Sequence, residues 1–219
     1  MRSMLVAALL ACVALPLAAQ GGMDHTTKVT GSGKLPGGWN ARFDQPGSAL
    51  TDVDVRQMGA LLNFRSGPAA IYWNTKDVAT DAYTVSAIFT QKKSMQHEAY
   101  GLFVGGQNLS DPTQNYLYFA IKPRDGTYLI NHRKGNSAPR GIVTLTASPA
   151  INRDAPGTGA ASNTIAIRVS RDSVFFYVNG QEVRSFPKSA IGGAPTEGLA
   201  GLRINHNIDV EVKEFGIKR

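Results

Sequence analysis

The chain has 219 residues, a hydrophobic fraction of 42% and a formal net charge of +7, with 23 Lys and Arg against 16 Asp and Glu. This length suits one all-β domain. The basic residues are scattered, whereas nucleic-acid binding usually needs them gathered in a patch with aromatic residues between them. The composition therefore argues against a nucleic-acid partner, and the only cysteine, Cys12, has no partner in the chain for a disulfide.

Residues 1–20 have the order of a secretory signal peptide. A basic residue, Arg2, precedes an apolar run that starts at Met4, and small residues close the segment. The run is too short and too rich in alanine for a membrane span. We therefore expect export to the periplasm or the medium. A lipid anchor on Cys12 is less favoured, because the apolar run continues beyond it where a polar tether should follow.

Residues 21–37 are rich in Gly, Thr and Lys and predict a flexible leader before a domain at residues 38–219. In that domain short β-type runs alternate with turn residues, and no ten residues keep a helical period. Such a pattern predicts an all-β fold with two stacked antiparallel sheets, a jelly-roll sandwich. The predicted strands are residues 60–64, 70–73, 83–90, 99–104, 116–121, 127–132, 142–146, 165–170, 174–178, 181–186, 198–204 and 208–217.

Two connections in this series are distinctive. Asn179 and Gly180 separate two alternating runs and are suited to a type I′ hairpin, in which both central residues need positive φ. Residues 105–112 read as a loop long enough to carry function.

Four motifs resemble the concanavalin A-like lectin and glucanase superfamily. They are Gly38-Trp39 with Arg42 and Asp44, Tyr100-Gly101-Leu102-Phe103, residues 176–180 and residues 198–204. Within that superfamily the chain is similar to laminin-G-type domains and to bacterial exported domains named for 3-keto-glycoside hydrolysis or lysis, over about residues 38–217. The resemblance implies a concanavalin-like jelly roll and carbohydrate recognition on a concave sheet face or at its rim.

Histidines and one glutamate stand at predicted strand ends. His97 and Glu98 precede one strand, His132 ends another, and His206 follows the strand at residues 198–204. Strand ends can meet at one rim of a sandwich, so Glu98, His97 and His206 are candidate catalytic or metal-binding residues. Unrelated strand-end residues are the plainer interpretation, because their spacing matches no known fingerprint.

Carboxylates give weaker signals. The Glu-x-Asp-x-x-Glu pattern of β-glucanases in this superfamily is absent, so hydrolysis by two carboxylates is not supported. Asn108 with Asp111, or Asp52 with Asp54, could offer oxygen ligands to a divalent cation such as calcium. The same residues suit turn formation equally well.

Alternation along the strands predicts one polar and aromatic sheet face for sugar binding. Tyr116 and Tyr118 share a side of their strand, and Glu98 and Tyr100 are placed with them if Phe103 faces the core. Tyrosines that merely cover an open sheet face would look the same. The predicted ligand-binding residues are Tyr100, Tyr116, Tyr118, Arg168, Arg203 and His132.

Three functions are compatible with these features. An exported module that binds carbohydrate is preferred, and an enzyme that processes glycosides, of the 3-keto-glycoside type, is the first alternative. A structural or adhesion domain is the second, and it should carry a large apolar surface patch.

Overall fold

The computed structural model describes residues 28–93 and 98–219, and its regular structure is almost all strand. The strands are β1 Trp39–Phe43, β2 Val53–Met58, β3 Leu61–Ser66, β4 Ala70–Ala79, β5 Tyr83–Gln91, β6 Tyr100–Gln107, β7 Asn115–Lys122, β8 Thr127–Lys134, β9 Arg140–Ala147, β10 Ala161–Val169, β11 Ser173–Val178, β12 Gln181–Pro187, β13 Gly198–Ile204 and β14 Ile208–Lys218. Two 3-10 turns, η1 at Leu50–Asp52 and η2 at Lys188–Ala190, complete it. Within these ranges no helix has the length and apolarity that crossing a membrane requires.

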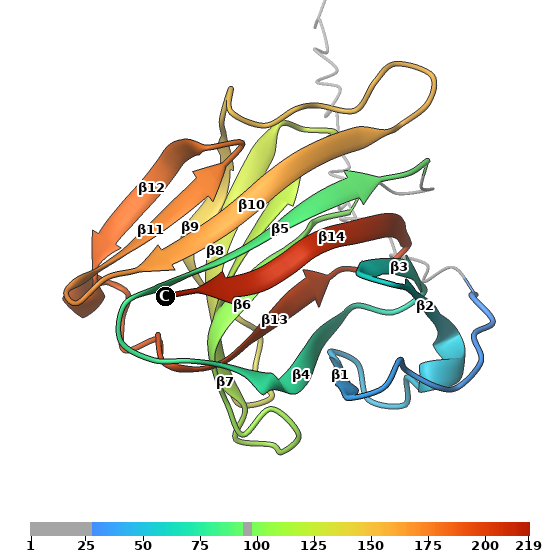
Figure 1. Cartoon of the computed structure of the whole chain (residues 1–219), viewed down its shortest axis with the longest axis horizontal. Coiled ribbons are helices and arrows are strands. Elements are labelled where there is room, and N and C mark those ends of the chain that lie inside the picture. The colour runs from blue at the N-terminus through green and yellow to red at the C-terminus, as the bar shows by residue number, and fades with distance from the viewer. Residues whose placement is uncertain (1–27, 94–97) are drawn as a thin grey trace, which may run out of the picture.

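The strands form two antiparallel sheets of seven, stacked as a sandwich (Figure 1). Sheet A has the order β1-β4-β13-β6-β7-β8-β9, and sheet B has the order β12-β11-β10-β5-β14-β3-β2. Strands that are distant in the sequence are therefore neighbours, such as β4 and β13. The predicted two-sheet β-sandwich is confirmed.

The core lies between the sheets. Along β5 every second residue is buried, and Val85, Ala87 and Phe89 are at most 1% exposed. Across the interface, the ring centroids of Phe119 in β7 and Phe176 in β11 are 5.3 Å apart. Apolar burial of this kind is the main stabilising contribution in a domain without disulfides.

The hairpin between β11 and β12 forms as predicted. Asn179 and Gly180 have φ angles of 50° and 79°, as a type I′ turn requires. Asn179 also has a structural role of its own: its Oδ1 accepts a hydrogen bond from Thr164 N, and its Nδ2 donates to Ala150 O, both at 2.8 Å. The turn is thereby anchored to two neighbouring segments.

Two strands were missed in the sequence, and several were made too short, most of all β4, which was expected to end at residue 73 and continues to Ala79. β1 and β2 are edge strands of their sheets. Every residue of β1 is half-buried, so it shows no alternation, and β2 ends in three exposed residues. β6 continues through Gly105 and Gly106, which were expected in a loop. Its register with β7 shifts after Val104, as a bulge accommodated by glycine allows.

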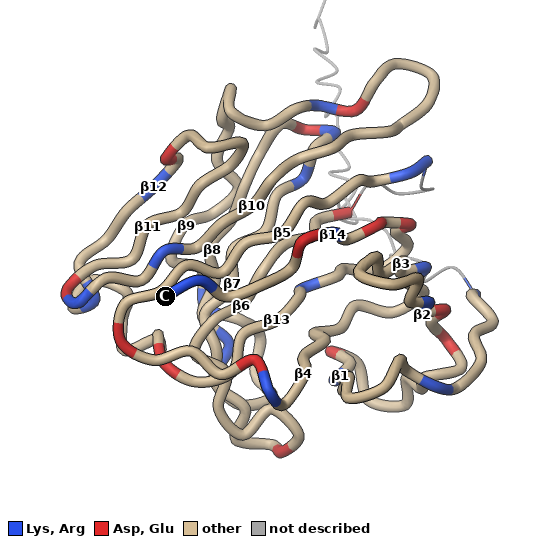
Figure 2. Tube along the Cα trace, in the orientation of Figure 1, with Lys and Arg blue, Asp and Glu red and all other residues tan. Residues whose placement is uncertain are grey.

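The described part of the expected leader contacts the sandwich. Gly31 N donates to Thr51 O at 2.8 Å, and Leu35 packs against the core. A Cβ at Gly31 would lie 1.7 Å from Val53 O, so only glycine allows this approach. Residues 28–37 of the predicted leader thus lie against the sandwich, and residues 21–27 are outside the described residues. Figure 2 shows acidic and basic residues interspersed along the described chain.

Candidate functional site

The outer face of sheet A, the face turned away from the core, carries a second apolar cluster. Leu117, Phe119 and Ile121 of β7 point into the core, so Tyr116 and Tyr118 lie on the outer face. The ring centroid of Tyr116 is 5.3 Å from that of Phe103 and 6.0 Å from that of Tyr118. The buried members are Ile71, Trp73, Ala99, Phe103, Leu109, Tyr116, Tyr118 and Ala120.

The tyrosines of this cluster are not open to solvent. Tyr116 is 1% exposed and Tyr118 is 6% exposed. Leu109, in the loop after β6, packs with them, and its carbonyl accepts a hydrogen bond of 3.3 Å from Arg42 Nη1 in β1. The two tyrosines are therefore buried packing residues of the outer face. They do not form the open sugar-binding platform that the sequence predicted.

Three charged side chains adjoin this cluster. Arg203, at the end of β13, donates from Nη1 and Nη2 to the two oxygens of Asp44, at 2.8 and 2.6 Å. Arg133 Nη2 of β8 lies 3.0 Å from Asp44 Oδ1. The guanidinium of Arg203 also lies 5.3 Å from the ring centroid of Tyr118. Because Arg203 and Arg133 are only 5% and 6% exposed, this ion-paired triad is held rigidly.

The triad determines the protonation state of Asp44. Burial raises the pKa of this carboxyl, but the charges and hydrogen bonds of Arg203 and Arg133 lower it more, so the pKa lies below its usual value. Burial lowers the pKa of Arg203, but Asp44 raises it by more. Both groups are therefore charged across the physiological pH range.

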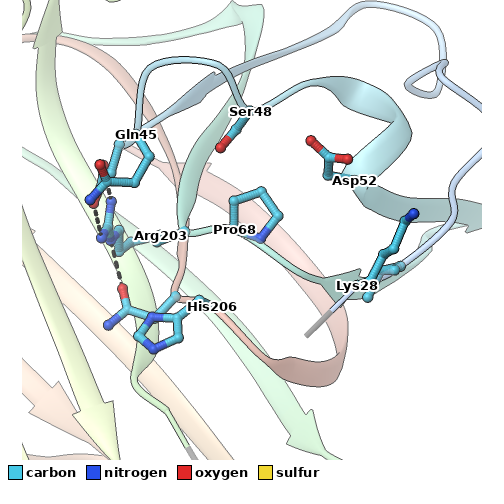
Figure 3. A pocket seen from close by; sticks show the side chains of 11 residues that line it. Lys28, Gln45, Ser48, Asp52, Pro68, Arg203 and His206 are labelled. Atoms are coloured by element: carbon cyan, nitrogen blue, oxygen red, sulfur yellow. Dashed lines mark hydrogen bonds and ion pairs between the residues drawn. The ribbon is translucent and has the colours of Figure 1, made fainter. Parts of the chain in front are cut away.

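A pocket of about 560 Å³ opens beside Arg203 and Asp44 (Figure 3). It lies where β1 and β13 end and β4 begins, with η1 on the opposite wall. Amide, hydroxyl, carboxylate, ammonium and imidazole groups line it together with three apolar residues. The lining residues are Lys28, Val29, Asp44, Gln45, Ser48, Asp52, Pro68, Ala69, Arg203, Asn205 and His206.

Hydrogen bonds orient two of the polar groups that line this pocket. Arg203 Nε lies 2.9 Å from Asn205 Oδ1. Because a guanidinium only donates, the side-chain oxygen of Asn205 must accept this bond, which leaves its amide nitrogen to donate to a ligand. Asp52 Oδ2 accepts a bond of 2.8 Å from Ala49 N, which fixes the carboxylate in the wall. The pocket is therefore preorganised.

The sequence predicted one sheet face that carries six residues, and the structure separates them. The six are Glu98, Tyr100, Tyr116, Tyr118, Arg168 and Arg203. Tyr116, Tyr118 and Arg203 do share the outer face of sheet A. The grouping is wrong for Tyr100, which points into the core and stacks on Phe89 with centroids 5.1 Å apart.

The grouping is also wrong for Arg168, which belongs to the other sheet. Arg168 lies in β10 of sheet B, 4.1 Å from the ring centroid of Phe175 and 5.7 Å from that of Tyr177. The cation and the two rings form a small exposed stack of their own, apart from the tyrosines of β7.

The histidine and glutamate candidates are only partly brought together. His97 lies outside the described residues. Asn205 N donates to Ala99 O at 3.1 Å, so the segments that carry Glu98 and His206 are neighbours. Only His206 lines the pocket, however, and the carboxylate of Glu98 lies 4.0 Å from Lys122 Nζ.

His132 belongs to a different place. It pairs across strands with the core residue Leu117, so its side chain is on the opposite face of sheet A from Tyr116. There it contributes to the wall of a separate, smaller pocket.

The candidate calcium ligands have local partners. Asp111 Oδ1 accepts bonds from Thr113 Oγ1 at 2.6 Å and Thr113 N at 3.2 Å, and these bonds lower the pKa of Asp111. Asp54 pairs with Arg56 at 2.7 Å. Within residues 28–93 and 98–219, no three His, Cys, Asp or Glu residues gather closely enough to hold a metal ion. Asp111 therefore stabilises a local turn, as the alternative interpretation of the sequence predicted.

Sequence reasoning did not assign Gln45, Ser48 or Asp52 to a binding pocket. They lie in the loop after β1 and in η1, where no hydrophobic period exists to place side chains. The available signal was local: Arg42 and Asp44 stand two residues apart, with Phe43 between them. That spacing puts both polar residues on one side of a strand.

Comparison with known proteins identifies the fold. No protein-family model and no curated protein matches the chain. Among solved structures, the carbohydrate-binding module CBM66 from Bacillus subtilis matches with a TM-score of 0.60 and 11% identity, over 83% of this chain and 96% of the module. The fold is a concanavalin-like jelly roll.

Two enzymes share this jelly roll. An endo-β-1,3-glucanase from Pyrococcus furiosus matches with a TM-score of 0.54 and 11% identity, over 82% of this chain and 87% of the enzyme. The catalytic domain of a laminarinase from Thermotoga petrophila matches with a TM-score of 0.51 and 12% identity, over 82% and 89%. At such low identity these likenesses concern the fold alone.

Proposed function

We propose that the protein is a carbohydrate-binding module whose ligand site is the pocket at the ends of β1 and β13. The observation that carries this proposal is the composition of the pocket. Its rigid floor of Asp44 and Arg203 is surrounded by Ser48, Asp52 and Asn205, which can donate to and accept from sugar hydroxyls.

The pocket also has the mixed character that sugar rings need. Val29, Pro68 and Ala69 supply apolar contact for the C–H faces of a ring, while the polar groups orient its hydroxyls. Preorganisation lowers the entropic cost of binding, because these side chains are ordered before the ligand arrives. The fold shared with a carbohydrate-binding module supports the same ligand class.

The test is a screen of neutral and acidic oligosaccharides, followed by calorimetric titration of the ligand found. Asp52→Asn keeps the shape of the wall but removes its charge, and we expect binding about tenfold weaker, as for loss of a charged hydrogen bond. Gln57→Ala, outside this pocket, is the matched control and should bind as the wild type does. Equal affinity of Asp52→Asn and wild type, with an unchanged melting temperature, would refute this site.

Glycoside processing is the alternative function, and one observation favours it. Asp52 and His206 line the same pocket, so a carboxylate and an imidazole are available together for acid-base chemistry. Asp44 is unsuited to donate a proton because two arginines keep it ionised. Release of product from the bound glycan, lost in His206→Ala while binding is kept, would establish an enzyme.

An adhesion domain is less supported. Among residues 28–93 and 98–219, the large exposed hydrophobic residues are Met58, Val78 and Leu145, and they stand on three different strands, β2, β4 and β9. Export by way of residues 1–20 is part of the proposal and rests on the sequence pattern of that segment.

A further inference from the structure

A second pocket, of about 270 Å³, has a strongly basic lining. It lies between the edge of sheet A, at β8 and β9, and the loop that follows η2. None of its residues lines the pocket beside Arg203. Its lining residues are His132, Lys134, Ala138, Arg140, Gly192 and Gly193.

The strand register gathers the basic groups. His132 of β8 is directly opposite Arg140 of β9, so their side chains emerge on the same face. Lys134 lies two residues beyond His132 and points to that same face. Within the part of the chain that the structure describes, neither Lys134 nor Arg140 forms an ion pair, and no lining residue is acidic. Positive charges placed together without a counter-charge repel one another.

Arg140 is held in place by backbone carbonyls. Its Nη2 donates to Ile191 O at 3.2 Å and to Gly192 O at 3.3 Å. Gly192 has a φ of 63°, and a Cβ there would come within 1.7 Å of Arg140 Nη2. Glycine is therefore required both by the backbone conformation and by the close approach of the guanidinium.

His132 is oriented by an amide. Its Nε2 lies 2.7 Å from Asn115 Oδ1, and because that oxygen can only accept, Nε2 carries the proton. His132 is 5% exposed. Burial lowers the pKa of His132, and the charges of Arg140 and Lys134 lower it further. The groups around the imidazole thus oppose a third positive charge in the pocket.

We propose that this pocket binds an oxyanion, namely the carboxylate or sulfate group of an acidic saccharide. Arg140 is fixed through Nη2 and can donate to an anion from Nη1, while Lys134 offers a mobile ammonium that can close on the anion. An anion bound between Arg140 and Lys134 offsets the repulsion between these two cations and favours protonation of His132. This site is independent of the proposed function, since it uses other residues and other chemistry.

The experiment follows the His132 ring signals by NMR while sodium sulfate, sodium glucuronate or glucose is added at constant ionic strength. We expect saturable shifts with glucuronate, whether or not sulfate also responds, none with glucose, and a higher pKa of His132 in the bound state. A response to sulfate alone indicates a free inorganic ligand and overturns the saccharide assignment.

Two variants distinguish a specific anion-binding site from non-specific attraction of anions to a basic protein. Lys134→Gln removes one of the two positive charges that line the pocket, and we expect about tenfold weaker anion binding. Lys213→Gln removes the same formal charge from β14 and should leave binding unchanged. Ring signals that do not respond to either anion, or equal weakening in both variants, would overturn the proposal.

Discussion

The outer faces of the two sheets use the same side-chain types with different consequences. On sheet A, Arg203 is 5% exposed, forms a bidentate pair with Asp44 and lies beside Tyr118. On sheet B, the exposed Arg168 lies over Phe175 and forms no ion pair with any of the residues that the structure describes. Both faces combine arginine with aromatic rings, and Arg203 lines the larger of the two pockets described above whereas Arg168 lines neither of them.

Burial explains the contrast. A buried charge must be matched by a partner, because the interior does not solvate it, and the match then fixes geometry. An exposed guanidinium over a ring is solvated already, so it gains little and remains mobile. The face of sheet A is therefore rigid enough to orient polar groups for a ligand, and the face of sheet B is not.

The largest effect is expected when the carboxylate shared by the two arginines of sheet A is removed. Asp44→Ala leaves Arg203 and Arg133 buried without a counter-charge, and we expect the free energy of unfolding to fall by about 3–5 kcal/mol, as for a broken buried ion pair. Urea denaturation measures it. Asp54→Ala is the matched control, because its partner Arg56 is 71% exposed and that pair should contribute little. Equal losses in the two variants would contradict a special role for the triad.

Lowering the pH should reduce the stabilisation that Asp44 provides. The pKa of Asp44 is lower in the folded protein than its value of about 3.9 in an unfolded chain. Its contribution to stability is therefore complete above about pH 5, where the unfolded carboxyl is also ionised, and is lost as the pH falls through the folded pKa. Between pH 5 and pH 3 the gap in unfolding free energy between wild type and Asp44→Ala should narrow. A difference in unfolding free energy that stays constant over this pH range would show that the pKa of Asp44 is the same in the folded and unfolded states.

The smallest effect is expected on sheet B. Arg168→Ala removes an exposed cation from the ring of Phe175, a contact that contributes about 0.5–1 kcal/mol. The melting temperature should fall by only a few degrees, and the affinity for glycan should not change. A loss as large as that of Asp44→Ala would mean that the stack on sheet B is an essential part of the fold.

Local patterns predicted most of the fold correctly. The alternation of β5, β10 and β11 and the hairpin at Asn179 and Gly180 depend on side chains and turns within a few residues of one another. β1 was missed because an edge strand with every residue half-buried has no period to read. For the same reason the loop after β1, with Ser48, was not assigned to a pocket.

The sequence by itself determined that this protein is a β-sandwich, because strand alternation and turn chemistry are local. It could not place Tyr100, since nearly every residue of β6 is buried on both faces of sheet A and alternation then carries no information. Nor could it bring Asp44 to Arg203 across 159 positions of sequence. Only the pairing of β1, β4 and β13 decided that, because strand order in a sheet depends on long-range contacts.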